Sequence, residues 1–169
     1  MADTVDPIIE EWRRVRPDLD VASMEVFARL TRVGGWIDGR FAGRGVDRRE
    51  FDVLGTLRRV GPPYRMTPSE LSRSLLAPTG TMTGRLDRLA GQGLIVRLPN
   101  PADRRGVIVS LTEEGVRRAD ELIEALLEEE AVMLEPFSPD DRRALADLLR
   151  VLVRSVEDHD RRQAPTPGR

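Results

Sequence analysis

The residues best suited to chemistry are arginines and small polar residues in the middle of the chain. The segment Asp103-Arg104-Arg105-Gly106 places two guanidinium groups in a turn-rich stretch between two β-rich runs. Arginines at a hairpin tip can enter a narrow DNA minor groove, where negative potential is concentrated. Asp103 could then hold one arginine in position and leave the other free to insert. In isolation the same residues fit an ordinary solvated turn, and only their context favours DNA.

A helix expected over about residues 78–91 precedes this hairpin. Met82, Leu86 and Leu89 recur at helical spacing and predict its buried face. Small and hydroxyl-bearing residues elsewhere on the helix would let its backbone approach DNA, and we expect Arg88 to contact a base or a phosphate. A glycine inside a helix costs about 1 kcal/mol relative to alanine, so a packing or close-approach reason is expected. The residues turned away from the core are Thr79, Gly80, Thr81, Thr83, Gly84 and Arg88.

Charge is distributed unevenly along the 169 residues, although the net charge is only −2. All 27 basic residues are arginine. Residues 40–110 contain 13 arginines and 6 acidic residues, whereas the rest of the chain contains 14 arginines and 23 acidic residues. A basic middle between acidic ends is typical of a nucleic-acid-binding protein, so double-stranded DNA is the expected partner.

Several classes of chemistry are not expected from the composition. The chain has no cysteine and a single histidine, His159, so thiolate metal sites, disulfides and serine–histidine catalysis are not expected. Its carboxylates accompany no nucleophile, metal-ligand set or phosphate-binding loop. We therefore predict no enzyme activity, metal or cofactor. Without an apolar run near the ~20 residues of a membrane-spanning helix and without an export signal, we expect a cytoplasmic protein that does not contact a membrane.

Capping signals divide the chain into elements that would position these residues. Asp47-Arg-Arg-Glu50 and Thr67-Pro-Ser-Glu70 each predict a helix start, because both form capping boxes. Pro7 suits the first turn of an extra N-terminal helix over about 7–16. Runs 94–98 and 107–111 predict two strands with a long turn-rich tip over 99–106. Helix–turn–helix followed directly by a hairpin is the winged-helix arrangement.

This part of the chain closely resembles the MarR family of bacterial transcription regulators. The similar run is TPSELSRSLLAPTGTMTGRLDRLAGQGLIVRLPNPADRRGVIVSLTEEG. It includes the D-x-R wing pattern at Asp103–Arg105 and the L-T-x-x-G pattern at Leu111–Gly115. The resemblance extends over about residues 5–160. It implies a homodimer whose terminal helices intertwine and whose two winged helices bind a pseudo-palindromic operator.

The predicted fold class is therefore mainly α with a small β-wing: a winged helix–turn–helix with N- and C-terminal dimerisation helices. We assign residues 1–45 to the N-terminal helices, which include the extra helix and contribute to dimerisation and a ligand pocket. Residues 46–111 form the winged helix–turn–helix, 112–160 the dimerisation helices and 161–169 a disordered tail. In the alternative, the leucine-striped helices after residue 112 pack on their own domain.

A narrower resemblance concerns the urate-responsive and PecS-like branch of the same family, which adds an N-terminal helix. The runs EEWRRVRPDLD and REFDVLGTLRRVG carry this resemblance. It implies that Trp12 and Arg85 bind a small anionic effector such as urate, and that Asp52 and Arg97 couple this pocket to the DNA-binding lobe. Arg85 also lies beside the buried face of its helix, where an unpaired charge is costly and an anion could neutralise it.

Each of these residues has a purely structural alternative. Trp12 could be a core anchor for the extra helix, Asp52 and Arg97 could form a plain ion pair, and Arg85 could contact a phosphate. These alternatives stay open on the sequence alone.

The sequence predicts a ligand-responsive DNA-binding repressor that acts as a homodimer and is released from its operator by a small anionic effector. The alternative is a winged-helix adaptor that binds protein and has no sequence-specific affinity for DNA. The charge of the middle segment separates the two, since an adaptor has no need of paired arginines in the wing.

Overall fold

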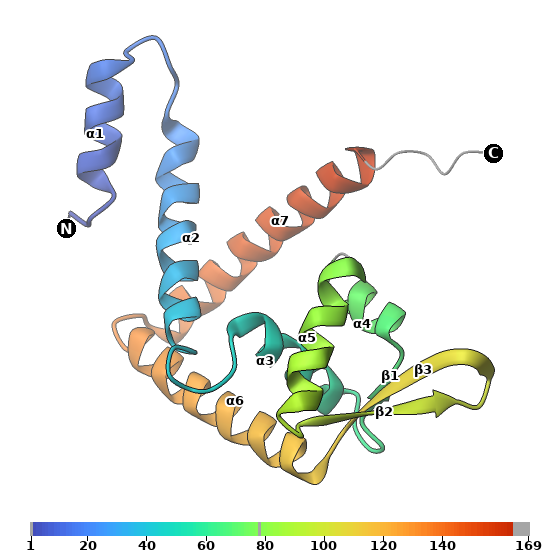
Figure 1. Cartoon of the computed structure of the whole chain (residues 1–169). Helices are drawn as coiled ribbons and strands as arrows, with labels where there is room; N and C mark the ends of the chain where they lie inside the picture. Colours follow the sequence, from blue (N-terminus) through green and yellow to red (C-terminus); the bar gives the residue numbers. More distant parts are fainter. Residues whose placement is uncertain (1, 78, 164–169) are drawn as a thin grey trace. The chain divides into compact units, whose positions relative to one another are not determined.

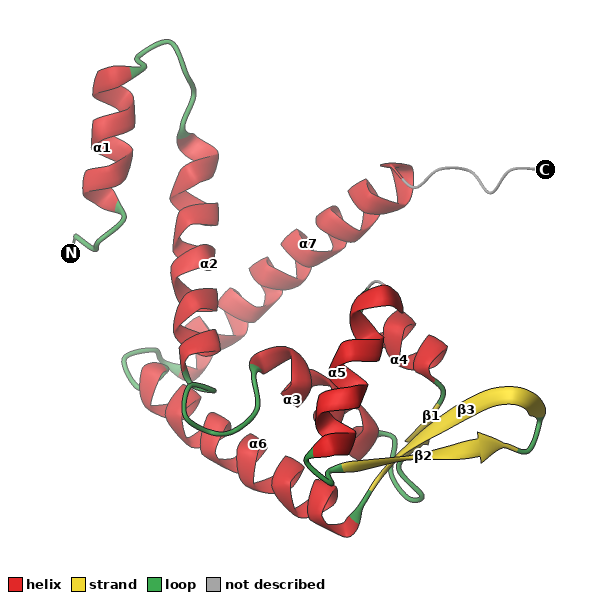
Figure 2. Ribbon diagram, viewed as in Figure 1, coloured by secondary structure: helices red, strands yellow, loops and turns green. Residues whose placement is uncertain are grey.

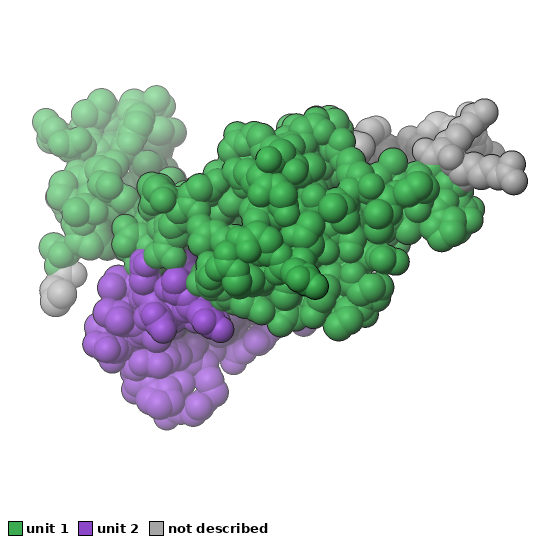
Figure 3. Space-filling view, turned by 60° about the horizontal axis from the view of Figure 1, so that its bottom comes forward, with its two compact units in different colours: residues 1–123 green, residues 124–169 purple. Residues whose placement is uncertain are grey.

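The structure is a computed structural model that describes residues 2–77 and 79–163; the side chains of Thr79, Arg104 and Arg105 also lie outside the described part. Two compact units, Met1–Ile123 and Glu124–Arg169, divide the chain (Figure 3). The described part is mostly helical with one small antiparallel sheet, as predicted (Figures 1 and 2). Its elements are α1 (Asp6–Val15), α2 (Ala22–Gly39), α3 (Arg48–Arg59), β1 (Arg65–Met66), α4 (Pro68–Ser74), α5 (Thr79–Gly91), β2 (Ile95–Asn100), β3 (Asp103–Leu111), α6 (Glu113–Met133) and α7 (Pro139–Gln163).

The first two helices form a hairpin with a small core of its own. Val5, Ile9 and Val21 are buried there, and Met24 and Ala28 pack against them. Ion pairs join the two helices outside this core: Arg29 bonds to Asp3 (2.7 Å) and to Asp6, and Arg13 bonds to Glu25 (2.6 Å). The extra N-terminal helix is thus attached to α2 by both apolar and charged contacts.

The winged helix packs around a second core in the same unit. Leu54 and Leu57 of α3, Leu71 of α4, and Leu86 and Leu89 of α5 are all at most 1% exposed. A glycine follows the end of α5: Gly93 has a φ of +72°, and the next N–H, of Leu94, bonds back to the Leu89 carbonyl (3.0 Å). This turn leads the chain directly from α5 into β2.

The wing differs from the prediction in two ways. Its tip is the short turn at Pro101 and Ala102, because β2 extends to Asn100 and β3 begins at Asp103, so the predicted long tip over 99–106 is wrong. Asn100 faces Asp103 in the sheet register. A third strand, β1, also pairs antiparallel with β3, which gives the order β1-β3-β2.

The second unit contains the end of α6 and the 25-residue helix α7. No residue of α7 is buried. Its helix continues to Gln163, so residues 161–163 are helical although a disordered tail was predicted from residue 161; residues 164–169 lie outside the described part. Among the described residues, no helix combines the length and the apolar content that crossing a membrane requires.

Close backbone contact fixes the start of α6 against the wing. The Thr112 hydroxyl donates to the Gly93 carbonyl (2.8 Å) and accepts from the Gly115 N–H (2.9 Å), which caps α6. A Cβ atom at Gly115 would lie 1.9 Å from the Leu94 carbonyl oxygen. Only glycine fits there, because backbone cannot move aside as a flexible side chain can.

We therefore predict that Gly115→Ala lowers the free energy of unfolding by about 1–3 kcal/mol or more, since a methyl group would force α6 away from Leu94. Urea unfolding at one fixed protein concentration measures this. Gly39→Ala is the matched control: a Cβ there meets nothing within 4 Å, so we expect a change of less than about 1 kcal/mol. Equal stability of the Gly115→Ala variant and the wild type would contradict the contact.

Candidate nucleic-acid interface

The helix–turn–helix is formed by α4 and α5, and a local signal starts its first helix. Thr67 accepts the Glu70 N–H (3.2 Å), and the Glu70 carboxylate accepts the Thr67 N–H (2.7 Å), so the predicted capping box is confirmed. The bond from the Thr67 backbone N–H lowers the pKa of Glu70 below its ordinary value, with a smaller contribution from the Thr67 hydroxyl. The helix α4 packs beside α5 as the bracing helix of the pair.

The second helix, α5, has a buried face and an exposed face. Met82, Leu86 and Leu89 are at most 1% exposed, as their spacing predicted. The opposite side carries the exposed residues Gly80, Thr81, Thr83 and Gly84. A Cβ added at Gly80 or Gly84 would meet nothing within 4 Å. Neighbours in the described part of the chain therefore do not require glycine at either position, and close approach to DNA stays a prediction for both.

The wing carries the predicted arginines on a strand. Arg104 and Arg105 follow Asp103 at the start of β3, directly after the turn. Gly106 lets the two strands come close here, because a Cβ at this position would lie 3.1 Å from atoms of both Asn100 and Asp103. The positioning of an arginine by Asp103 remains a prediction, since the side chains of Arg104 and Arg105, like that of Thr79, lie outside the described part.

Arg88 is engaged within the protein. Its Nε lies 2.6 Å from Oε1 of Glu50, a carboxylate that is only 1% exposed, and Nη2 lies 3.7 Å from Oδ2 of Asp47. The side chain of Arg88 is otherwise 63% exposed. Sequence reasoning placed this arginine on the DNA-facing side and missed its partner, because Glu50 was recognised only as a capping residue.

The two residues expected to couple the lobes have different partners from those considered. Arg97 of β2 pairs with Asp87 of α5 (2.7 Å), and Asp52 of α3 pairs with Arg48 one turn earlier (2.9 Å). The direct Asp52–Arg97 ion pair, one of the two alternatives, is therefore wrong. The sequence could not distinguish an Arg97–Asp87 pair from an Arg97–Asp52 pair, because an ion pair between separate elements depends on how those elements pack. Arg97 instead links β2 of the wing to α5.

A pocket of about 350 Å³ opens at Arg85. Its lining comes from α3, the link after α4 and α5, and consists of Arg49, Asp52, Leu75, Leu76, Ala77, Thr81 and Arg85. Arg85 is half-buried, and it forms no ion pair with any residue in the described part of the chain. An anion of small size could fill this pocket and pair with Arg85.

Trp12 lies elsewhere in the single chain. It is absent from the lining of the pocket at Arg85, so the structure does not bring these two predicted ligand-binding residues together within one chain. Trp12 is 43% exposed and does not belong to the small core of Val5, Ile9 and Val21. The alternative in which Trp12 anchors the extra helix in that core is therefore wrong for the single chain.

A larger cavity of about 630 Å³ adjoins this pocket and shares Asp52 and Leu75 with it. Phe51, Gly55 and Ala119 contribute apolar lining, and Arg59 is one of its charged lining residues. Arg58, also in the lining, makes a two-bonded ion pair with Asp120 of α6 (2.7 and 3.1 Å), which raises the pKa of Arg58 above its ordinary value. Sequence analysis missed this cavity because its lining residues come from separate elements.

The chain is a winged-helix protein: its helix–turn–helix, whose second helix α5 has an exposed polar face, is followed directly by a hairpin that carries arginines. Residues 44–106 match the MarR family. The HTH-type transcriptional regulator PecS of Dickeya dadantii is 40% identical over 159 residues, which cover 92% of this chain and 93% of PecS. The chain belongs to the MarR family, as its wing and L-T-x-x-G patterns indicated.

Two further comparisons agree with this assignment. The HTH-type transcriptional repressor YetL of Bacillus subtilis is 26% identical over 145 residues, which cover 83% of this chain and 86% of YetL. The structure of wild-type apo MarR from Escherichia coli superimposes with a TM-score of 0.64 at 25% identity, and the match covers 79% of this chain and 97% of MarR.

A substitution at Gly84 should change the stability of the protein and its affinity for DNA in opposite directions. We predict that Gly84→Ala raises the free energy of unfolding by about 0.5–1 kcal/mol, because alanine favours a helix and its methyl group meets no neighbour. The same methyl group would weaken DNA binding by about tenfold if this face meets the duplex. Urea unfolding and fluorescence anisotropy measure the two effects. Gly91→Ala, in the same helix and equally open, should leave DNA affinity unchanged; wild-type affinity in Gly84→Ala would exclude this face.

Proposed function

We propose that this protein is a ligand-responsive transcriptional repressor that binds a pseudo-palindromic operator as a homodimer and is released by a small anionic effector. The observation that carries the proposal is the exposed face of α5, where a Cβ added at Gly80 or Gly84 would meet nothing within 4 Å. The similarity to proteins named as transcriptional regulator and transcriptional repressor supports the same function.

DNA recognition is assigned to α5 and the wing. Exposed threonines can bond to phosphates and contact thymine methyl groups, and glycines permit close approach of the helix backbone in the major groove. Arg104 and Arg105 are assigned to the minor groove beside it, and Asp103 to their positioning. Thr79 at the first position of α5 completes the set.

Homodimerisation is supported by two long helices that leave large apolar side chains exposed in a single chain. Neither α2 nor α7 contains a buried residue. Leu148 of α7 is 69% exposed and Phe27 of α2 is 52% exposed. Burying a leucine or phenylalanine side chain contributes about 1.5–3 kcal/mol, so a second copy of the chain that covers these faces would stabilise both. We assign dimerisation to these helices.

The effector site is assigned to the pocket at Arg85. Arg85 provides the charge and has no carboxylate partner in the described part, and a flat anion would pair with it through two hydrogen bonds. Trp12 is assigned to the same effector, in which case it must come from the partner of the homodimer. Asp52 lines the pocket and Arg97 links β2 to α5, which suits them to couple effector binding to the DNA-binding face. Urate is the first effector to test.

Anisotropy of a labelled duplex from immediately upstream of the protein's own gene tests the function, with unlabelled unrelated DNA as competitor. We expect sequence-specific binding that urate relieves, and we expect Arg85→Ala and Trp12→Phe to lose the response to urate. Specific binding that ignores urate and every other anion, in wild type and variants alike, would exclude this effector site. Binding no tighter than to unrelated DNA would favour a protein-binding adaptor.

The wing makes a separate prediction. Arg105→Ala should weaken operator binding by about tenfold or more and make it less steeply dependent on salt, because one fewer cation is available to release counterions from DNA. Titrations at several salt concentrations measure both quantities. Arg117→Ala removes the same charge from an exposed site on α6, where Arg117 pairs with Glu114 and Glu121, and should bind like the wild type. Unchanged binding in Arg105→Ala would refute the wing assignment.

A further inference from the structure

The carboxylate of Glu50 is buried although its capping role does not require burial. Glu50 closes the capping box of α3: its Oε2 accepts the Asp47 N–H (2.9 Å), and its own N–H donates to Asp47 Oδ1 (2.8 Å). It is 1% exposed, whereas Glu70, in the same position of the α4 capping box, is exposed. Removing a carboxylate from water is costly unless a charge or hydrogen bonds compensate it, so Glu50 needs more than its cap.

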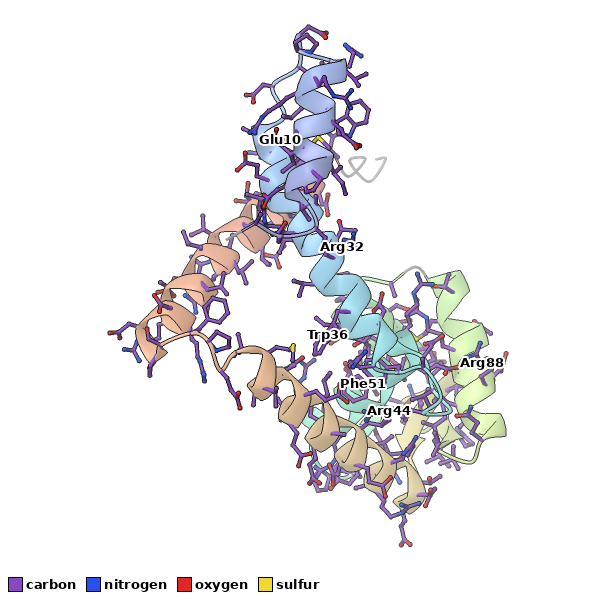
Figure 4. All side chains as sticks on the ribbon, turned by 90° about the vertical axis from the view of Figure 1, so that its left-hand side faces the viewer. Glu10, Arg32, Trp36, Arg44, Phe51 and Arg88 are labelled. Atoms are coloured by element: carbon purple, nitrogen blue, oxygen red, sulfur yellow. The ribbon has the colours of Figure 1, made fainter. Side chains whose placement is uncertain are left out.

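Arg88 of α5 supplies that compensation. Its Nε lies 2.6 Å from Glu50 Oε1, so an ion pair joins α5, on which Figure 4 labels Arg88, to the first turn of α3. A second contact follows one helical turn later in sequence, where Gln92 donates from Nε2 to the Gly45 carbonyl (2.9 Å). Gln92 follows directly after α5, so the two contacts attach the C-terminal end of α5 to the start of α3 and the loop before it.

We propose that Arg88 is a positioning residue rather than a DNA-reading one: it anchors α5 to the buried Glu50 carboxylate and thereby sets the angle at which the Gly80–Gly84 face is presented. This inference rests on the proposed DNA-binding function. An arginine whose Nε is committed to a buried carboxylate is held in one orientation, and the orientation of its helix is held with it. Arg88 acts on DNA affinity through the helix, and Glu50 is equally required.

The Glu50→Gln variant distinguishes a positioning role of Arg88 from direct contact with DNA. It removes the charge of the Glu50 side chain and leaves Arg88 and the capping oxygen of residue 50 in place. We expect Glu50→Gln to weaken specific binding by about tenfold or more, to spare binding to unrelated DNA, and to leave the salt dependence unchanged. Arg88→Ala should show the same loss, and the double variant should lose little more, because either change removes the same contact. Anisotropy on the upstream duplex and on an unrelated duplex measures all three.

The matched control is Glu70→Gln, which makes the same change in an exposed capping box that receives no arginine from α5. It should bind within about twofold of the wild type, because glutamine also serves at this capping position. Wild-type or tighter binding in Glu50→Gln, together with a salt slope reduced by about 0.9 in Arg88→Ala, would overturn the proposal, because Arg88 would then be neutralising a phosphate.

Hydrogen exchange of α5 distinguishes failure of this inference from failure of the proposed function. If wild-type protein shows no specific binding to any duplex, the DNA-binding function fails, and exchange alone decides the anchor. Amide exchange over residues 79–91 should then be faster in Glu50→Gln and Arg88→Ala than in the wild type and Glu70→Gln. Exchange unchanged in both anchor variants would overturn the positioning role.

Discussion

A carboxylate shielded from water must be neutralised, and the Glu50 carboxylate meets this requirement through Arg88 of a different helix. Breaking a buried ion pair by removing one partner costs up to about 3–5 kcal/mol, and less here because Arg88 keeps much of its side chain in solvent. Asp87, the preceding residue, pairs on the surface with Arg97 of the wing. Adjacent residues therefore attach α5 to α3 and to β2, and the buried pair is the stronger constraint of the two.

Features encoded within a few residues could be read from the sequence. The capping boxes at Asp47 and Thr67 begin helices where predicted, because their hydrogen bonds connect residues only three apart. The buried stripe of α5 follows from helical spacing alone, as the burial of Leu86 and Leu89 confirms. Local chemistry therefore fixes the start of α3 and α4 and the two faces of α5 without any knowledge of the tertiary structure.

Features that depend on contacts between distant segments could not be read in this way. Pro99 and Asn100 are typical of turns, yet pairing with β3 keeps them in a strand and shortens the tip. The two-residue strand β1 carries too little pattern to be recognised before its partner is known. No local pattern around Arg97 indicates its partner, and the packing of β2 against α5 brings it to Asp87.

The pocket at Arg85 and the buried ion pair both lie between α3 and α5, which gives the proposed switch a physical basis. Asp52 lines the pocket from α3 and Arg85 from α5, while Glu50 and Arg88 join these helices about one turn away. An anion between Asp52 and Arg85 would be attracted by one and repelled by the other, so it would favour a different separation of the helices. Because the Glu50–Arg88 ion pair resists displacement, the part of α5 around Arg85 would have to tilt while Arg88 stays in place. The effector would then act through its differential affinity for two orientations of α5, the requirement that any such switch must satisfy.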